Sequence, residues 1–557
     1  MIVPFVMTLL TINMYPYLWY FYKSLDMAKK KGWPIIAQEK YFEKPSSLLK
    51  RNGVNVSYIT NEKIASSKFG YELPVDDDLE KIQQYPIPLE MENRLIKVQG
   101  SINNAFVYMM RNSWQELEEL LDSYFTKIAE TNEEDIEAIV TLFGFPSLYN
   151  AAKKHNIPVI TIEHGLFREP SYKKTAYFTF SELCDEEGIR KRYEDFKKYV
   201  QELPILSRKE ILSILLTDES LPYLNFFHQL PRFEIGVALG YTTWMPHMAN
   251  TYCNDEELLY TVSHLYDNYI MRKHPGDPVG SSYRSFHPVS DSSRNTVEFI
   301  LKCKRVVSLG SNVSLESAYW NRSPYTILSS SSSYGLKKDL NDKEEYSIDI
   351  EYLNFFAFCY LVPYKFMMDP KYIMWRLSDP AEKELFQKHL EYYLDDFNCS
   401  YETLAKLPEE RRLEYILKQR GCNDLNNLNV RASWMFAPKP KPNGSIPVAV
   451  AQEIMAENKL LTSEINRHIE AEKRYEVAFV EMKSVIEKNK GLADEQSRLK
   501  ADYESLQEQH KSMLDRLEYV ENDYNRIINS TSWKITKPVR ASLDFIKKGF
   551  KKSRKAD

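Results

Sequence analysis

Three short segments combine residue types that could move a proton or bind an anion. The first is Glu163-His164-Gly165, followed by Arg168, where a strand predicted over 158–165 ends in a turn. A carboxylate or an imidazole in such a place can act as a general acid or base. Ligands of open α/β sheets bind at the carboxyl ends of the strands, so the position favours function. A structural role remains the alternative, because Glu and His at strand ends are often structural.

The second segment is Arg272-Lys273-His274-Pro275, again at the end of a predicted strand, over 268–276. Three potential cations beside a proline that turns the chain suit a phosphate group. The alternative is an ordinary surface turn.

In the third segment, a strand predicted over 305–311 runs into a loop of small polar residues and then into a helix over 313–320. Free backbone N–H groups at a helix N-terminus bind phosphate well, and neighbouring hydroxyl groups add donors. We expect Glu316 in the first helical turn, within reach of a ribose or a base. The alternative is a capped helix with Ser311 or Asn312 as N-cap. The candidate binding residues here are Ser308, Ser311, Asn312, Ser314 and Glu316.

Alternating strand and helix patterns surround these segments and predict two α/β domains. Near the N-terminus an apolar strand is followed by a helix over 17–31, which Gly32 ends. A second series of strands and helices begins near 233–240. Strand–helix alternation is typical of parallel sheets, so we expect two facing Rossmann-like domains.

Changes in pattern along the chain predict seven segments. A proline-rich stretch marks the linker after the globular part. The expected segments are 1–180 (first Rossmann-like domain), 181–232 (helical connection), 233–350 (second Rossmann-like domain), 351–434 (helical crossover), 435–453 (linker), 454–529 (coiled coil) and 530–557 (basic tail).

Both ends of the chain carry apolar patterns that could involve a membrane. Residues 2–22 have no charge, so a membrane anchor is the alternative to a buried strand and helix.

Apolar residues alternate at spacings of three and four over 454–529, which predicts a coiled coil and a homodimer or homotrimer; one solvated helix is the alternative. The tail after 530 mixes Lys and Arg with apolar residues, which is typical of a membrane-surface helix, and a solvated tail is the alternative.

Composition excludes several classes of protein. Of the 557 residues, 43% are hydrophobic and 27% charged, which rules out a disordered chain. The net charge of −5 gives no basic field for nucleic acid. Six widely spaced cysteines without a CxxC pair exclude a zinc ribbon and favour a reducing compartment. The acidic run 76–78 has no preceding strand, so we expect no metal site there.

Together the three segments resemble a family of bacterial GT-B glycosyltransferases that use CMP-activated sugars. The resemblance is to capsule polysaccharide biosynthesis proteins and related β-Kdo transferases of surface polysaccharides. The acidic-x-Gly motif of that family corresponds to Glu163-His164-Gly165, its His-Pro motif to His274-Pro275 and its serine loop to 311–314. Residues 355–384 resemble its crossover region, and 530–538 resemble a motif that recurs in bacterial polysaccharide glycosyltransferases.

The resemblance implies an enzyme of the cytoplasm, bound at the inner face of the cell membrane. It would move Kdo or a similar ulosonic acid from CMP to a lipid-linked or growing O-antigen or capsule chain, with a chain-terminating cap as one possible product. The segments 272–275 and 308–316 would hold the nucleotide, and Glu163, with His164 and Arg168, would act at the sugar or the acceptor hydroxyl. GT-B sites stabilise the leaving phosphate with cations and helix dipoles, so no metal or other cofactor is expected.

The sequence departs from the family at one place. Retaining β-Kdo transferases carry a nucleophilic Asp in the turn after the first strand of the second domain, whereas residues 240–250 contain no carboxylate. The stereochemical outcome therefore stays open. Two further functions remain possible on this sequence: transfer from a nucleoside-diphosphate sugar, and a non-catalytic scaffold of a polysaccharide assembly complex.

Overall fold

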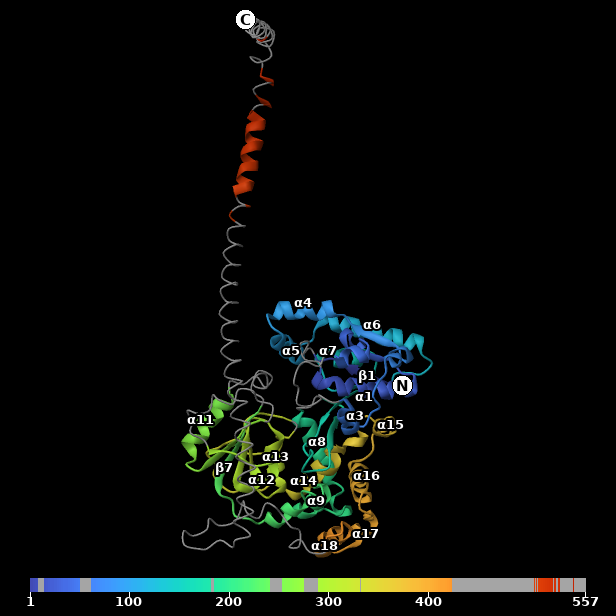
Figure 1. Ribbon diagram of the computed structural model, residues 1–557, viewed down its shortest axis with the longest axis vertical. Coiled ribbons are helices and arrows are strands. Elements are labelled where there is room, and N and C mark those ends of the chain that lie inside the picture. Colours follow the sequence, from blue (N-terminus) through green and yellow to red (C-terminus); the bar gives the residue numbers. More distant parts are fainter. Residues whose placement is uncertain are drawn as a thin grey trace. The chain divides into compact units, whose positions relative to one another are not determined.

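The structure, a computed structural model, describes most of the globular part of the chain (Figure 1). It covers residues 1–8, 15–50, 62–181, 185–240, 253–274, 289–330 and 332–422, together with most of 505–530 and residue 544. The chain divides into two compact units, Met1–Ala437 and Pro438–Asp557. All the described strands lie in the first unit, where they form two sheets.

The first sheet has seven strands in the order β12-β6-β5-β4-β1-β2-β3. The five strands from β5 to β3 are parallel, and β6 is antiparallel to both of its neighbours. The strands are β1 (Ile2–Val6), β2 (Ile35–Gln38), β3 (Gln84–Ile87), β4 (Ala138–Thr141), β5 (Val159–His164), β6 (Thr175–Thr179) and β12 (Leu361–Pro363).

Helices cover both faces of this sheet because β1 is buried on both sides. Ile2 and Val6 belong to one core cluster and Val3 and Phe5 to another. The first cluster includes residues of α1 (Tyr15–Lys31) and the second includes residues of the helices after β3 and β4. The remaining helices of this part are α2 (Pro45–Lys50), α3 (Glu62–Phe69), α4 (Leu89–Gln99), α5 (Ile102–Arg111), α6 (Gln115–Thr131) and α7 (Pro146–Lys154).

Residues 2–31 thus contain a strand and a helix of the first domain. Trp19, Phe21 and Leu25 of α1 are at most 3% exposed, packed in the core. None of the helices in the described part of the chain has the length and hydropathy of a membrane span.

The second sheet is parallel throughout, in the order β11-β10-β7-β8-β9. Gly236 of its central strand lies so close to the helix before β10 that a Cβ atom would come within 2.7 Å of the Phe299 ring. The elements are β7 (Phe233–Ala238), α11 (Asp255–Leu265), β8 (Tyr269–Arg272), β9 (Val289–Ser290), α12 (Thr296–Lys302), β10 (Cys303–Ser308), α13 (Asn312–Tyr319) and β11 (Ser323–Thr326).

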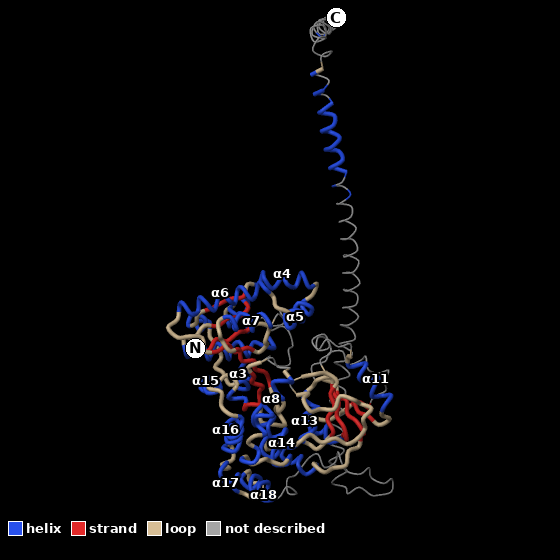
Figure 2. Tube along the Cα trace, turned by 180° about the vertical axis from the view of Figure 1, so that it is seen from behind, coloured by secondary structure: helices blue, strands red, loops and turns tan. Residues whose placement is uncertain are grey.

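Helices from two distant parts of the chain pack into one hydrophobic cluster beside the second sheet. After β11 the chain returns to the first sheet, where β12 pairs with β6. Figure 2 shows the strands of the two sheets, in red, as two separate groups. The helices are α8 (Glu186–Lys197), α9 (Arg208–Leu215), α14 (Ile350–Phe355), α15 (Pro370–Leu377), α16 (Glu382–Asp395), α17 (Tyr401–Lys406) and α18 (Glu409–Gln419), and a π-helical turn, Phe356–Tyr360, precedes β12.

Several sequence predictions differ from the structure in detail. The sequence predicts the last strand of the second sheet over 325–330, whereas β11 spans Ser323–Thr326, and the sequence does not predict the short strands β3, β6, β9 and β12. The apolar run over 54–60, for which the sequence predicts a further strand, lies outside the described residues. In the second unit, residues 509–523 are helical with Met513, Leu517 and Val520 exposed. Most of the predicted coiled coil lies outside the described residues, so its pairing stays a prediction.

An ion pair joins α8 of the helical connection to α16 of the helical crossover. Arg192 Nε lies 2.6 Å from Glu382 Oε1, and Nη2 donates to the Cys359 carbonyl oxygen at 3.0 Å. The side chains are 22% and 10% exposed. We expect Arg192→Met to lower the free energy of unfolding by about 3–5 kcal/mol, because Glu382 would keep a buried charge without its partner. Urea denaturation followed by circular dichroism measures this.

A double variant, Arg192→Met with Glu382→Leu, is the matched control. We expect it to recover a large part of the lost stability, since it removes both charges together. Equal losses in the single and double variants would contradict this account.

Candidate functional site

At the end of β5, the side chains of Glu163 and His164 lie on opposite faces of the sheet. Neighbouring residues of a strand alternate between faces. Glu163 is paired in register with Tyr177 of β6, and His164 is paired with Ala176. The two side chains, adjacent in sequence, therefore belong to different surroundings.

His164 lies among aromatic rings. Its ring centroid is 4.9 Å from that of Trp19 and 5.7 Å from that of Tyr364, which it meets in a parallel stack. Burial, with further contributions from Arg168 and nearby lysines, lowers the pKa of His164 to about 3. The imidazole is therefore neutral at physiological pH, and its packing indicates a structural role in this cluster.

Glu163 and Arg168 form the polar part of the motif. Burial raises the pKa of the Glu163 carboxyl, and the Arg168 guanidinium opposes that effect. Arg168 is exposed, and it donates to the backbone oxygens of Gly165 at 2.8 Å and His164 at 3.0 Å. These two bonds fix a cation beside the carboxyl group. Gly165 permits the tight approach of β6, because a Cβ atom there would lie 2.8 Å from the Thr175 carbonyl carbon.

Two tyrosines from the segment after Gly165 connect this motif to helix α13 of the second sheet. The Tyr177 hydroxyl donates to Asn312 Oδ1 at 2.8 Å. The Tyr172 hydroxyl donates to Glu316 Oε1 at 2.8 Å and accepts a bond from Trp320 Nε1 at the same length. The first and third candidate segments, which are about 150 positions apart, thus meet directly.

The serine loop is organised by its own hydroxyl groups. The Ser308 and Ser314 hydroxyls lie 2.8 Å apart, and both residues are fully buried. Ser311 is the N-cap of α13, and its side chain accepts a bond from the Val313 backbone. Ser308 and Ser314 therefore shape the loop, while the half-buried Ser311 and Asn312 form its accessible part.

Glu316 is more deeply buried than the sequence predicts. Its residue is only 5% exposed, and burial raises the pKa of the carboxyl to about 7. The bond from Tyr172 opposes this rise, as do the charges of Arg272 and Arg168. Glu316 therefore serves to join the two halves of the unit, although both arginines lie within its electrostatic reach.

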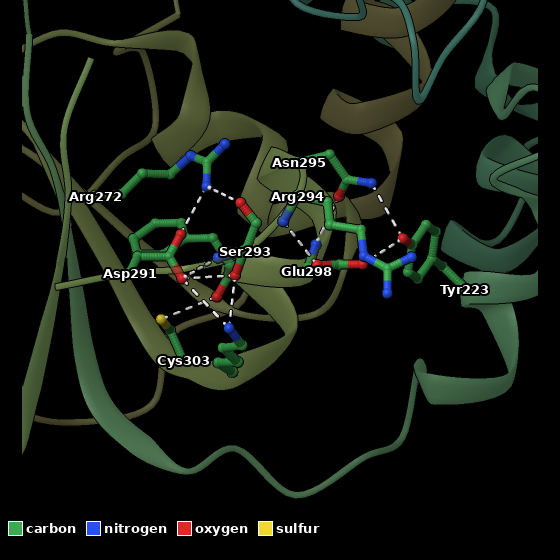
Figure 3. A network of polar contacts seen from close by, with 10 residues as sticks. Tyr223, Arg272, Asp291, Ser293, Arg294, Asn295, Glu298 and Cys303 are labelled. Atoms are coloured by element: carbon green, nitrogen blue, oxygen red, sulfur yellow. Dashed lines mark hydrogen bonds and ion pairs between the residues drawn. The ribbon is translucent and has the colours of Figure 1, made fainter. Parts of the chain in front are cut away.

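Arg272 belongs to a buried polar network at the end of β8 (Figure 3). Its Nη1 lies 2.6 Å from Asp291 Oδ2 and donates to the Ser293 carbonyl oxygen at 3.2 Å. The Asp291 side chain is fully buried and also pairs with Lys302 at 3.3 Å. In Figure 3 one terminal nitrogen of Arg272 points away from this network.

The next residues continue from β8 toward a part that the structure does not describe. Lys273 is half-buried and His274 exposed. Pro275 and the turn over 241–250, where the sequence lacks the expected Asp, lie outside the described residues. Within the described ranges, no group of three or more His, Cys, Asp or Glu residues could hold a metal ion.

Sequence reasoning missed the residues that join the segments. Tyr172, Tyr177, Trp320 and Asp291 had no motif to mark them. The partners of Tyr172, Tyr177 and Asp291, in contrast, include the candidate binding residues Glu316, Asn312 and Arg272. Tyrosine is abundant, with 38 residues, so its type alone was no signal.

Comparison with known proteins identifies the first domain. Residues 5–187 match the glycosyltransferase 99 family N-terminal domain. No curated protein matches the chain. The mixed α/β fold with two largely parallel sheets agrees with the expected GT-B architecture.

Solved structures give a more distant likeness. KpsC of Thermosulfurimonas dismutans, a β-Kdo 2,7 transferase, is 14% identical with a TM-score of 0.28, over 45% of this chain and 83% of that one. Its β-Kdo 2,4 transferase is 11% identical with a TM-score of 0.29, over 43% and 87%. MurG of Acinetobacter baumannii is 11% identical with a TM-score of 0.24, over 75% and 94%. On the match of its first domain, the chain is a glycosyltransferase.

Proposed function

We propose that this glycosyltransferase moves Kdo or a Kdo-like ulosonic acid from CMP to a bacterial surface polysaccharide. The acceptor would be a lipid-linked or growing O-antigen or capsule chain at the cytoplasmic face of the cell membrane. The resemblance of the three motifs and the family match of residues 5–187 support this proposal. Strands β5 and β6 form an antiparallel hairpin that carries Glu163, here called the Glu163 hairpin. The main structural support is its direct contact with helix α13 through Tyr177 and Asn312.

The accessible groups suit a nucleotide phosphate. The N-terminus of α13 carries Ser311 and Asn312. The side-chain oxygen of Asn312 already accepts the bond from Tyr177, so the side-chain NH₂ group of Asn312 is left as a donor. Exposed Arg168 adds a positive charge, and His274 follows β8. Fixed donors and cations of this kind stabilise the charge on a leaving phosphate, and a metal is not needed for that task.

Glu163 is the candidate base. In the proposed reaction it takes the proton from the acceptor hydroxyl while the acceptor oxygen bonds to the anomeric carbon and the bond to the CMP phosphate oxygen breaks. A carboxyl whose pKa is raised by burial is a better proton acceptor than an exposed one. His164 would position the strand end through its aromatic contacts.

The C-terminal segments complete the proposal. The spacing of apolar residues over 454–529 supports a homodimer or homotrimer, and the basic amphipathic tail over 530–557 supports binding to the membrane surface. A coiled coil with a membrane-bound tail would hold the catalytic domains at a set distance from the membrane. Such a distance could set the length at which the polysaccharide chain is terminated.

Nucleotide binding tests the donor. We expect the full-length protein to bind CMP more tightly than UDP or GDP in calorimetry. His274→Ala should weaken CMP binding at least tenfold, or about 1.4 kcal/mol, because this residue corresponds to the His-Pro motif of the family that the sequence resembles, which contacts the CMP phosphate.

His264→Ala, at an exposed histidine of α11, is the matched control and should leave CMP affinity unchanged. Preference for UDP or GDP would favour a nucleoside-diphosphate sugar instead. A folded protein that binds no nucleotide would favour the scaffold function, to which the missing carboxylate over 240–250 also points.

Replacing the candidate base tests the mechanism. We expect Glu163→Gln to reduce kcat for CMP release from CMP-Kdo at least 100-fold, since general base catalysis contributes roughly 10²–10⁴-fold. CMP affinity should change less than threefold. Glu119→Gln, at an exposed glutamate of α6, is the control. Full activity in Glu163→Gln would exclude this residue as the base.

The raised pKa of Glu316 predicts how stability depends on pH. The folded-state pKa of about 7 exceeds the ordinary value of 4.5, so the folded protein binds the proton more tightly and is destabilised as pH rises between these values. Glu316→Gln keeps an acceptor for Tyr172 without the charge. We therefore expect its Tm relative to wild type to rise from pH 5 to pH 7 and to stay constant above pH 8. A difference in Tm that is the same at every pH would contradict this assignment.

A further inference from the structure

A cavity of about 720 Å³ opens on the His164 side of the first domain. Its walls come from α1, α3, the segment before β6, the segment after β12 and helix α16. Seven lysines and four carboxylates line it, an excess of three positive charges. None of the candidate residues of the nucleotide site is part of this lining.

Aromatic rings and lysine ammonium groups meet in this cavity. The Nζ atoms of Lys23 and Lys174 lie 5.7 Å and 5.6 Å from the centroid of the Tyr364 ring. Lys68 and Lys174 lie 5.5 Å and 5.8 Å from the centroid of Phe69. The ammonium groups of three lysines thus lie within 6 Å of the centroid of the Tyr364 ring, the Phe69 ring or both. His164 stacks on Tyr364 and also contacts Phe69, so both rings are held in place.

The carboxylates of the cavity are already engaged with other groups. Asp26 pairs with Lys30 at 3.0 Å, Glu169 with Lys174 at 3.2 Å and Asp396 with Lys173 at 2.8 Å. The fourth, an aspartate, caps helix α15.

Lys23 has a different environment. It donates to the Phe69 carbonyl oxygen at 2.7 Å, and among the described residues no carboxylate lies within 4.0 Å of its Nζ atom. Burial lowers the pKa of Lys23 to about 8; the charge of Asp26 opposes that effect and the charge of Lys174 adds to it. An anion beside these two lysines would relieve their repulsion.

Two hydroxyl groups of the lining also lack partners. Tyr364 is 8% and Tyr393 1% exposed, and neither hydroxyl has a hydrogen-bond partner among the described residues. A buried hydroxyl without a partner costs free energy, which a bound acceptor or donor would recover.

We propose that this cavity binds an anionic saccharide, a sugar that carries a phosphate or a carboxylate group. Lys23 and Lys174 pair with the anionic group, and the Tyr364 and Tyr393 hydroxyls bond to the oxygens of the sugar. Because His164 and Glu163 lie on opposite faces of the strand, this site is separate from the proposed nucleotide site, and it does not depend on the identity of the donor.

Calorimetry with three sugars tests the site on the full-length protein. We expect glucose 1-phosphate, glucuronate or both to bind with a Kd in the millimolar range or below, and glucose to show no binding. The double variant Lys23→Gln/Lys174→Gln should raise that Kd at least tenfold. Which of the two charged sugars binds tells whether the site takes a phosphate or a carboxylate.

Controls separate this site from the donor site and from a loss of folding. Lys127→Gln, at a lysine 5.9 Å from the Tyr85 ring and outside the cavity, should bind like wild type. Saturating CMP should leave the sugar affinity unchanged. Tyr364→Phe keeps the ring and should weaken binding several-fold at an unchanged Tm, even if the double variant does not fold. Any of four results would overturn the proposal. They are displacement of the charged sugar by CMP, equal binding of glucose, unchanged binding in both the Lys23→Gln/Lys174→Gln and the Tyr364→Phe variants, and no binding at all.

Discussion

The contact between the Glu163 hairpin and helix α13 is the interaction on which the candidate site depends. Two tyrosine hydroxyls, those of Tyr172 and Tyr177, connect the segment after β5 to the first turns of α13. The bonds are short, and the Tyr172 bond is shielded from water by its burial. They bring the carboxyl ends of strands from two different sheets together, which is the arrangement that two facing α/β domains need for a shared ligand.

The end of β5 has two roles because strand residues alternate between faces. Glu163 lies on the side that reaches α13, with Arg168 fixed beside it by backbone oxygens. His164 lies on the other side, where it supports the Phe69 and Tyr364 rings of the lysine-lined cavity. A single dipeptide thus borders both a candidate catalytic site and a candidate saccharide site, and the sheet separates them.

The return of the chain to the first sheet makes both sites possible. Strand β12 pairs with β6, and the residues that follow it, among them Tyr364, close the cavity. The Arg192–Glu382 ion pair joins α16, which contributes to the cavity wall, to α8. Distant segments therefore form one core with the second sheet, and the unit from Met1 to Ala437 contains both sheets.

Local patterns in the sequence were sufficient to predict the main strands and the helices α1 and α13, because periodicity acts within a few residues. They left Ser311 and Asn312 as alternative N-caps of α13, and the structure shows that Ser311 is the cap. They also located Glu163, Arg272 and the serine loop at strand ends. Tertiary structure alone decided that His164 packs among aromatic rings, that Ser308 and Ser314 are buried, and that Glu316 bonds to Tyr172. These outcomes depend on which distant segments pack together, and no local pattern encodes such contacts. The short strand β12 follows the same logic, since it gains its hydrogen bonds from β6, which lies far away in the sequence.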